Sequence, residues 1–396
     1  MRNVIGFPAE GENFYNRPKI INTIHRRVQN DNLFMAAPRR SGKTSIMKYL
    51  QQNPQEGFHF IYATCEEIYH AEDFYKTLLE VVLNSDAVKR ITKFSAKSKG
   101  VIESVVENIK KIGIFGVELE LQSKKSEFAY YEQFKDLCSK LNESEEQIVI
   151  MIDEFPSAVE NIGKATNAQA AVHFLQQNRS IRQNSTNAIR FIYTGSIGLP
   201  VLVNKLGFPE AINDLNTVNI PPLSDEEAKE LVTSLLVSFD INIEPAASDY
   251  LIKKIEWLMP FFIQLSIQEL VEVYDDNPID INIEMVDLAF QKMYGRRNSL
   301  HLSSYSNRLK DAFISENEYI KAKEILAYLS EHTTVDKAHF FPNKQDETEQ
   351  RIARYIFDTL EFDGYIFYDE NTKHYRFNSP ILKNWWKNNK IGRAHV

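Results

Sequence analysis

The sequence predicts an α/β protein with a parallel sheet in its first half, and three observations support this fold class. Short apolar runs alternate along residues 18–222 with longer stretches of helical periodicity. The run 148–152 is apolar at every position, as in a strand buried on both faces. A Gly-Lys-Thr sequence at residues 42–44 follows one run and precedes a helix. Such alternation is typical of a parallel sheet covered by helices on both sides.

The predicted strands are short and rich in β-forming residues. They comprise residues 33–36, 58–63, 148–152, 189–193 and 218–220. The first helix begins at Pro18, because proline has the backbone angle of a helix start and lacks an N–H that the first turn does not use. Apolar spacing predicts further helices over 45–50, 72–83 and 128–141.

Residues 89–127 interrupt this alternation, and we interpret them as an insertion of one helix and a β-ribbon. Serine, lysine and glycine break the pattern, and a helix over 101–110 gives way to alternation up to residue 121. The basic side chains of the insertion are interleaved with glutamates, which favours a solvated surface over phosphate contacts.

The central motif is a phosphate-binding loop between the strand 33–36 and the next helix. Such a loop surrounds an anion with backbone N–H groups, aims a helix N-terminus at it, and supplies a lysine to the β- and γ-phosphates and a hydroxyl to Mg²⁺. Gly42, Lys43 and Thr44 fit these roles, whereas Ala37 stands where the motif has its first glycine. The expected nucleotide-binding residues of the loop are Ala37, Pro38, Arg39, Arg40, Ser41, Gly42, Lys43, Thr44 and Ser45.

Two carboxylates close the buried strand 148–152 and form the second predicted site. Asp153 and Glu154 lie at its carboxyl end, the edge at which open α/β sheets bind their ligands. We expect Asp153 to hold Mg²⁺ through water, together with Thr44, and Glu154 to orient or deprotonate the attacking water. A strand followed by a helix cap is the alternative, and the pairing with the phosphate loop favours the site.

The same pair indicates ATP hydrolysis. A glutamate beside the metal-binding aspartate suits the activation of water, which small-molecule kinases do not need. A GTPase would carry an Asn-Lys-x-Asp base reader, and the nearest match, residues 204–207, ends in glycine. We therefore expect ATP and Mg²⁺ as ligands, with Lys43 and Glu154 as catalytic side chains. Thr194, at the end of the strand 189–193, is a third catalytic candidate, although a strand-end turn capped by Thr194 and Ser196 explains its hydroxyl equally well.

After Pro221 and Pro222 the sheet is expected to end and the chain to become mainly helical. Ser224 and Glu227 form a capping box that opens this region. Helices over 319–329 and 349–360 and a hairpin over 364–377 are typical of a winged helix. The predicted domains are a core (1–222, with the insertion 89–127), a helical lid (223–297), a winged helix (298–390) and a tail (391–396).

Composition restricts the class of protein. The chain has 396 residues, enough for two or three domains, and no apolar run long enough for a membrane span. The N-terminal residues lack the apolar core of a signal peptide, and two cysteines, Cys65 and Cys138, suit a reduced compartment. We therefore expect the cytoplasm. The net charge of −8 gives no overall attraction to nucleic acid, and residues 300–390 carry 13 Lys plus Arg against 14 Asp plus Glu.

With these residues in view, the chain resembles the archaeal-type ATPases of the STAND and AAA-like P-loop group, over most of its length. The most specific match is residues 38–45, Pro-Arg-Arg-Ser-Gly-Lys-Thr-Ser. The resemblance implies ATP and Mg²⁺ between a core and a helical lid, a winged helix, and an Asp-Glu strand adjacent to the loop strand or next but one. In related proteins a Gly-x-Pro motif of the lid meets the adenine, and Pro260 alone matches it here. Further matching segments are Asn16-Arg17, Ile152-Asp153-Glu154, Thr194-Gly195-Ser196, Tyr375-Arg376-Phe377 and Trp385-Trp386.

The leading interpretation is an ATP-driven switch, with slow hydrolysis, that engages a protein partner. The alternatives are a DNA-binding ATPase similar to origin initiators, with the winged helix on duplex DNA, and a nucleotide-locked scaffold that hardly turns over. Acidic side chains beside Arg351 and Arg354 on the expected recognition helix disfavour contact with phosphates. We expect no contact with membranes, and the sequence is compatible with an oligomer.

Arg39 and Arg40 distinguish this loop from those with small or neutral residues. Successive side chains leave the backbone in different directions, so two adjacent arginines cannot both bury against one triphosphate. One is expected to point outward, towards acidic groups of the lid, the insertion or a neighbouring subunit, and to make closure depend on ATP. Alternatively, both only add positive potential near the phosphates.

Overall fold

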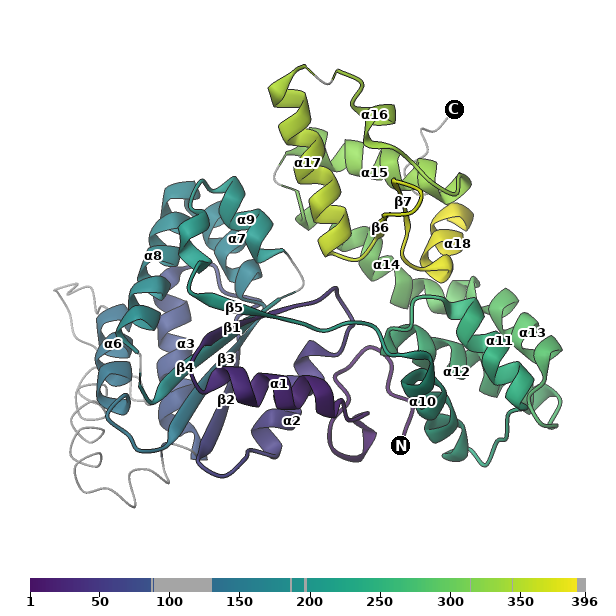
Figure 1. The fold of residues 1–396 in the computed structure, drawn as a ribbon, viewed down its shortest axis with the longest axis horizontal. Helices are drawn as coiled ribbons and strands as arrows, with labels where there is room; N and C mark the ends of the chain where they lie inside the picture. The colour runs from purple at the N-terminus through teal and green to yellow at the C-terminus, as the bar shows by residue number, and fades with distance from the viewer. Residues whose placement is uncertain are drawn as a thin grey trace, which may run out of the picture. The chain divides into compact units, whose positions relative to one another are not determined.

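The computed structural model of the protein describes residues 1–86, 88, 130–185, 187–195, 198–313, 315–343 and 345–389. The expected insertion 89–127, Ser196 and the tail 391–396 lie outside the described residues. The chain forms two compact units (Figure 1). The sheet unit consists of Arg17–Ala36 and Ile46–Asn219, and the helical unit of Met1–Asn16, Ala37–Ser45 and Ile220–Val396.

A parallel five-stranded sheet forms the centre of the sheet unit, which confirms the predicted fold class. Its strand order is β2-β3-β4-β1-β5, so the Asp-Glu strand β3 lies next but one to β1, the strand before the phosphate loop. The register aligns Leu33 with Ile192 and Ile150 with Phe191. The strands are β1 (Asn32–Ala36), β2 (Phe58–Thr64), β3 (Gln147–Asp153), β4 (Ile189–Thr194) and β5 (Leu215–Asn219).

Helices α1 and α2 cover one face of this sheet (Figure 1). His25 of α1 meets the ring edges of Phe58 and Phe60 at centroid distances of 5.7 and 5.2 Å. Lys48 of α2 lies 4.1 Å from the ring centroid of Tyr62 on the same strand. Burial lowers the pKa of His25, which favours the neutral imidazole. The two helices are α1 (Pro18–Val28) and α2 (Lys43–Gln52).

The opposite face is covered by helices whose aromatic side chains interlock. Phe74 of α3 lies 4.8 Å from Phe174 of α8, and Phe155 of α7 lies 4.6 Å from Tyr193 of β4, both as ring-centroid distances. Edge-to-face pairs of this kind stabilise a core beyond the area that they bury. The other helices in the described residues of this unit are α3 (Ala71–Asn84), α6 (Tyr130–Leu141), α7 (Phe155–Ala165), α8 (Ala168–Asn184), α9 (Leu199–Lys205) and the 3-10 turn η2 (Pro209–Ile212).

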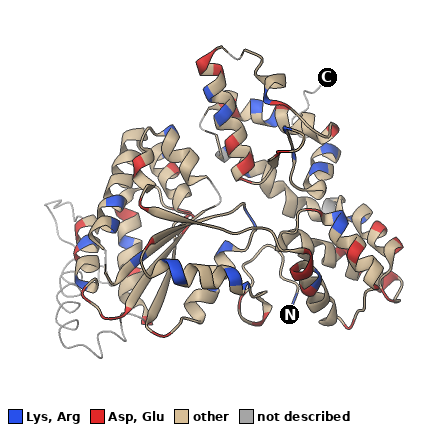
Figure 2. Ribbon diagram, in the orientation of Figure 1, with Lys and Arg blue, Asp and Glu red and all other residues tan. Residues whose placement is uncertain are grey.

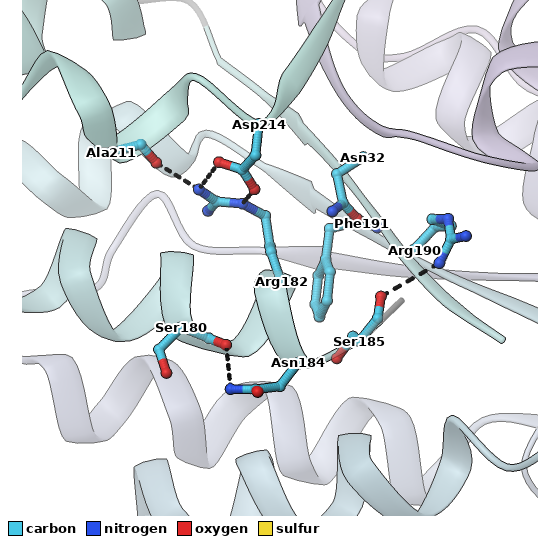
Figure 3. A network of polar contacts seen from close by, with 9 residues as sticks. All are labelled: Asn32, Ser180, Arg182, Asn184, Ser185, Arg190, Phe191, Ala211 and Asp214. Atoms are coloured by element: carbon cyan, nitrogen blue, oxygen red, sulfur yellow. Dashed lines mark hydrogen bonds and ion pairs between the residues drawn. The ribbon is translucent and has the colours of Figure 1, made fainter. Parts of the chain in front are cut away.

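A buried ion pair connects α8 to the segment before β5 (Figure 3). Arg182 is 2% exposed and donates to the two carboxylate oxygens of Asp214 at 2.7 and 2.9 Å, and also to the Ala211 carbonyl. Close by, Arg190 of β4 donates to the Ser185 carbonyl at the end of α8. Removal of one partner from a buried pair costs about 3–5 kcal/mol, so this network fixes α8 to the edge of the sheet.

The helical unit has one extended hydrophobic core. Its buried apolar side chains, from Leu223 to Trp386, form a single cluster. The capping box predicted at Ser224 is present, because Ser224 accepts from the Glu227 N–H and Glu227 accepts from the Ser224 N–H. The first helices of the unit are α10 (Asp225–Val237), α11 (Pro245–Ile255), α12 (Pro260–Asp276), α13 (Ile283–Met293) and α14 (Arg296–Asp311).

Further helices and an antiparallel hairpin complete this unit. Tyr368 of β6 is opposite Tyr375 of β7, and Val335 forms an isolated bridge to Tyr375. The helices predicted over 319–329 and 349–360 and the hairpin are present, while the division into lid and winged helix stays a prediction. The elements are α15 (Glu316–Glu331), α16 (Lys337–Phe340), α17 (Glu347–Phe362), β6 (Ile366–Asp369), β7 (His374–Phe377) and α18 (Pro380–Asn388).

The N-terminal segment, with the 3-10 turn η1 (Gly11–Asn13), packs on the helical unit. Asn3 donates to the Gln264 carbonyl at 2.8 Å, and the Tyr15 hydroxyl donates to Glu230 at 2.9 Å. These contacts join the start of the chain to α12 and α10. None of the helices in the described part of the chain is long and apolar enough to cross a membrane.

Candidate nucleotide-binding site

The phosphate loop is the segment that joins β1 to α2. Arg40 and Gly42 have left-handed backbone angles, with φ of 63° and 90°, on either side of Ser41. Turns of this kind direct successive N–H groups to one side and form a concavity for an anion. Helix α2 begins at Lys43, so a helix N-terminus, which favours negative charge, follows the turn directly. These backbone features support the predicted phosphate site, which stays a prediction.

Lys43 is 5% exposed and folds back on the loop. Its ammonium group donates to the carbonyl oxygens of Ala37 and Pro38, each at 2.9 Å. Both acceptors are neutral, and a phosphate oxygen would be a stronger, charged acceptor for the same ammonium group. The lysine thus lies at the centre of the loop, in a position that supports its predicted contact with phosphate.

Both loop arginines contact helix α14. Arg39 donates to the Ser304 carbonyl at 3.1 Å, and Arg40 donates to the Ser304 hydroxyl at 3.2 Å and to the His301 carbonyl at 3.4 Å. The Arg40 guanidinium also lies 4.2 Å from the ring centroid of Phe261, a cation–π contact. Burial is the main cause of the lowered pKa of Arg40.

The expected contact of one of these arginines with acidic groups stays a prediction. Arg39 and Arg40 reach the same helix, and the bonds to Ser304 and His301 are made with a hydroxyl and carbonyl oxygens rather than with carboxylates.

The start of the hairpin also approaches the loop closely. A Cβ atom on Gly364 would lie 2.7 Å from Cβ of Pro38 and 2.6 Å from the ring of Trp257. With φ of 79°, Gly364 is also in a conformation that side chains disfavour. Trp257 is 8% exposed and belongs to the core, and Pro260, the expected adenine contact, is the first residue of α12. Its contact with adenine stays a prediction.

In the sheet unit, Asp153 ends β3 and is held through both carboxylate oxygens. The Tyr62 hydroxyl donates to Oδ2 at 3.1 Å, and the Glu154 N–H donates to Oδ1 at 3.0 Å. Burial raises the pKa of Tyr62, and Asp153 raises it further, so the phenol keeps the proton that it donates. Asp153 itself is 4% exposed, at the edge of the sheet predicted for the ligand.

The chemistry of the predicted donors fits Mg²⁺. The Asp153 carboxylate and the Thr44 hydroxyl supply oxygen atoms, which this small, hard cation prefers. Among the described residues, no group of three or more His, Cys, Asp and Glu side chains suits a metal ion. Mg²⁺ does not need such a group, because it keeps several waters and takes further oxygens from the phosphates of a nucleotide.

Glu154 occupies a tight turn between β3 and α7. Its backbone is left-handed, with φ of 58°, and its side chain accepts a hydrogen bond from the Ser157 hydroxyl at 3.1 Å. A Cβ atom on Gly195 would lie 2.4 Å from Cδ of Pro156 and 3.6 Å from Cα of Glu154. The glycine therefore lets the end of β4 approach the turn that carries Glu154, a close contact that explains why a glycine follows Thr194.

Thr194 is fully buried at the end of β4, and its hydroxyl donates to the Met35 carbonyl of β1 at 3.2 Å. This bond uses the only hydroxyl proton. It favours the strand-end interpretation of Thr194, and a catalytic contact stays a prediction.

Sequence reasoning did not anticipate several side chains that hold the site residues. Tyr62, Ser157 and Ser304 each bond to a predicted site residue. A signal existed for Tyr62, because it stands one residue before the end of the predicted strand 58–63 and therefore near the edge where ligands bind. Ser304 lies in a helix that sequence reasoning did not identify.

No protein-family model matches the sequence, and no curated protein matches it. Solved structures match over most of the chain. The Walker-type ATPase PABY2304 of Pyrococcus abyssi is 13% identical with a TM-score of 0.63, over 97% of this chain and 99% of that chain. The ORC2 protein of Aeropyrum pernix, solved in ADPNP-ADP complexes, is 11% identical with a TM-score of 0.50, over 94% and 92%. The chain therefore has the mixed α/β fold of P-loop NTPases, with a helical C-terminal region.

Proposed function

We propose that the protein binds Mg·ATP, hydrolyses it slowly and works as a nucleotide-controlled switch that engages a protein partner. The observation that carries this proposal is the attachment of the phosphate loop to helix α14 through Arg39 and Arg40. Some groups of this loop would hold the phosphates, and others hold helix α14. Nucleotide binding can therefore be coupled to the position of that helix, provided that the nucleotide changes the geometry of the loop.

The proposed roles follow the chemistry of each side chain. The loop N–H groups and Lys43 hold the β- and γ-phosphates, and Thr44 and Asp153 hold Mg²⁺, with water between Asp153 and the ion. Glu154 orients or deprotonates the attacking water. Bound Mg²⁺ supplies neutralisation of the charge that develops on the phosphates. The proposed site also includes Pro260, which would contact the adenine, and Thr194, which would lie near the γ-phosphate.

The coupling has a direct physical path. When the Lys43 ammonium turns to a phosphate, the carbonyl groups of Ala37 and Pro38 lose a charged donor and the loop has to adjust. Arg39 follows Pro38 directly, so the adjustment reaches the contact with Ser304 within one residue. Coupling energies between two sites are typically about 1–3 kcal/mol, or about 5- to 150-fold in affinity, and a few charge-assisted bonds can supply this.

Charges in the helical unit favour a protein partner over duplex DNA. Figure 2 shows positions of Lys or Arg together with positions of Asp or Glu along helix α17. On α17, Arg351 and Arg354 share the helix with Glu347, Glu349 and Asp358. Binding to duplex DNA requires a face on which basic side chains neutralise several phosphates.

Limited proteolysis with and without ATP tests the switch. We expect ATP to change the cleavage pattern of the parent protein. Arg40→Ala is expected to bind ATP within a few-fold of the parent and to lose this change, because it removes the contacts with Ser304, His301 and Phe261. Arg27→Ala is a matched control, since Arg27 bonds to neutral groups of the sheet unit, at 2.9 Å to Asn216, and its pattern is expected to change as in the parent.

Two results would contradict the proposal. If calorimetry detects no binding of ATP to the parent protein, the assignment of ATP as the ligand is wrong. If Arg39→Ala and Arg40→Ala lose affinity equally and keep the cleavage change at saturating ATP, the arginines only add positive potential. Salt-dependent binding to duplex DNA, measured with and without ATP, would instead support the initiator-like alternative.

A further inference from the structure

We infer that Tyr62 is a positioning residue for the metal-binding carboxylate and fixes Asp153 in the orientation in which it supports Mg²⁺. The inference rests on the proposed function, because it takes Asp153 as the residue that supports the ion. Neither the phosphate-loop motif nor the Asp-Glu motif includes Tyr62, and it comes from a strand that carries none of the predicted site residues.

The register of the sheet brings Tyr62 and Asp153 together. In the parallel pair of β2 and β3, Thr64 is aligned with Asp153, and Tyr62 with Met151. Side chains two residues apart on a strand share a face, so Tyr62 and Asp153 lie on one face of the sheet, on neighbouring strands. The long phenol spans the offset of two residues, and its hydroxyl reaches Oδ2 of Asp153 at 3.1 Å.

Helix α2 holds the other side of the phenol. The ammonium group of Lys48 lies 4.1 Å from the centroid of the Tyr62 ring, which identifies α2 as the cover of this sheet face. Lys48 follows Thr44 by four residues, and residues at this spacing share one face of a helix. The ring is therefore held by the helix whose first turn carries the proposed hydroxyl ligand, and its hydroxyl holds the proposed carboxylate.

The two contacts of the carboxylate differ in origin. Oδ1 accepts from the backbone N–H of Glu154, and Oδ2 accepts from the Tyr62 side chain. Together they restrict the rotation of the carboxylate plane and therefore the directions of its lone pairs. Hydrogen bonds to a ligating carboxylate orient it and tune its affinity for the metal. Of these two contacts, the one with Tyr62 can be removed by substitution without a change in the backbone.

Tyr62→Phe provides the test, because it removes the hydroxyl and keeps the ring under Lys48. The measurement is the binding of ATPγS in EDTA and over a titration with MgCl₂. We expect the Mg²⁺ concentration for half-maximal effect to rise about 10-fold, the lower end of the range for groups that orient metal ligands, with unchanged affinity in EDTA. Tyr75→Phe is the matched control, since its hydroxyl bonds to Asn178 at 3.0 Å instead, and it is expected to keep the Mg²⁺ requirement of the parent.

A purely structural role would have a different result. It would lower the thermal stability of Tyr62→Phe without nucleotide and leave the Mg²⁺ requirement unchanged, and this would overturn the inference. Asp153→Ala separates the inference from the proposed function. If Asp153→Ala raises the Mg²⁺ requirement and Tyr62→Phe does not, only the inference fails. If Asp153→Ala leaves the requirement unchanged, the metal role of Asp153 and the inference fail together.

Discussion

The two groups of residues proposed to bind ATP are held in place in different ways. In the sheet unit, Asp153 is fixed by Tyr62 on the neighbouring strand, and Glu154 by Ser157 one turn along the next helix. In the phosphate loop, Arg39 bonds to a helix 265 residues further along the chain. The chemistry at the sheet edge is thus set within the sheet unit, whereas the state of the loop depends on the helical unit. A test of each group can therefore have a separate outcome.

The largest effect is expected at the sheet edge. Glu154→Gln keeps the size of the side chain and loses its basicity, so we expect it to bind Mg·ATP normally and to lose turnover by about 10²- to 10⁴-fold. Asp153→Ala is expected to weaken the Mg²⁺-dependent part of binding instead. Single-turnover hydrolysis and ATP titrations with and without Mg²⁺ measure the two effects. If both variants hydrolyse ATP at the parent rate, the end of β3 has only a structural role, and the sheet edge is not part of the ATP site.

Lys43→Ala tests the loop. The substitution removes the ammonium group that is proposed to contact the phosphates of ATP in a buried site. Loss of such a charge-assisted contact costs about 2–5 kcal/mol, or about 30-fold to several thousand-fold in affinity for ATP. Calorimetric titration with ATP measures this loss. Lys19→Ala, on the exposed side of α1, is the matched control and is expected to bind as the parent does. Unchanged affinity of Lys43→Ala would contradict the assignment of the loop.

Gly195→Ala sharpens the comparison, because it strains the sheet edge without altering a proposed ligand. The added methyl group would meet Pro156 at 2.4 Å, and such overpacking costs about 1–3 kcal/mol of stability. We also expect slower hydrolysis, since the strained turn carries Glu154. In Gly163→Ala the methyl group meets Ala171 at 3.4 Å, an ordinary contact, so this control is expected to be neutral or slightly stabilising. Chemical denaturation compares the two variants.

The smallest effect concerns pH and reports on the sheet unit alone. Burial lowers the pKa of His25 from its usual 6.5, so the unfolded chain takes up a proton in a pH range where the folded protein resists it. The free energy of unfolding is therefore expected to fall as the pH falls below about 6.5, by at most about 1.4 kcal/mol per pH unit. His25→Leu is expected to flatten this dependence. An equal slope in both proteins would show that His25 does not contribute to it.

Elements whose signal is local were predicted well from sequence. Four of the strands follow from short β-forming runs, and the start of α1 follows from Pro18, whereas β5 begins three residues before the predicted run 218–220 and ends one residue before its end. The capping box at Ser224 also needs only the four residues that form it. Each of these features depends on neighbours within one turn or one strand, and such patterns are visible without knowledge of the fold.

Features that depend on distant residues could not be predicted. The sequence around Arg182 is that of an ordinary helix and gives no sign of the ion pair with Asp214, which lies 32 residues further along the chain. Helix α14 has few apolar residues in a regular pattern, and the contacts of its buried face come from the loop and the other helices. The contacts of Arg39 and Arg40 with Ser304 and His301 could not be predicted for the same reason, because the acceptors are groups of that helix.

The helical unit contains three separate stretches of the chain, and the phosphate loop is the middle one. This has a consequence for synthesis on the ribosome. The helix partner of Arg39 is made 265 residues after the arginine, which at about 5–20 residues per second is a delay of roughly 13–53 s. The strands β1 to β5 are all complete before that helix emerges. During translation the nascent chain is therefore expected to form its sheet first, and to acquire the arginine contacts of the loop only when α14 has been made.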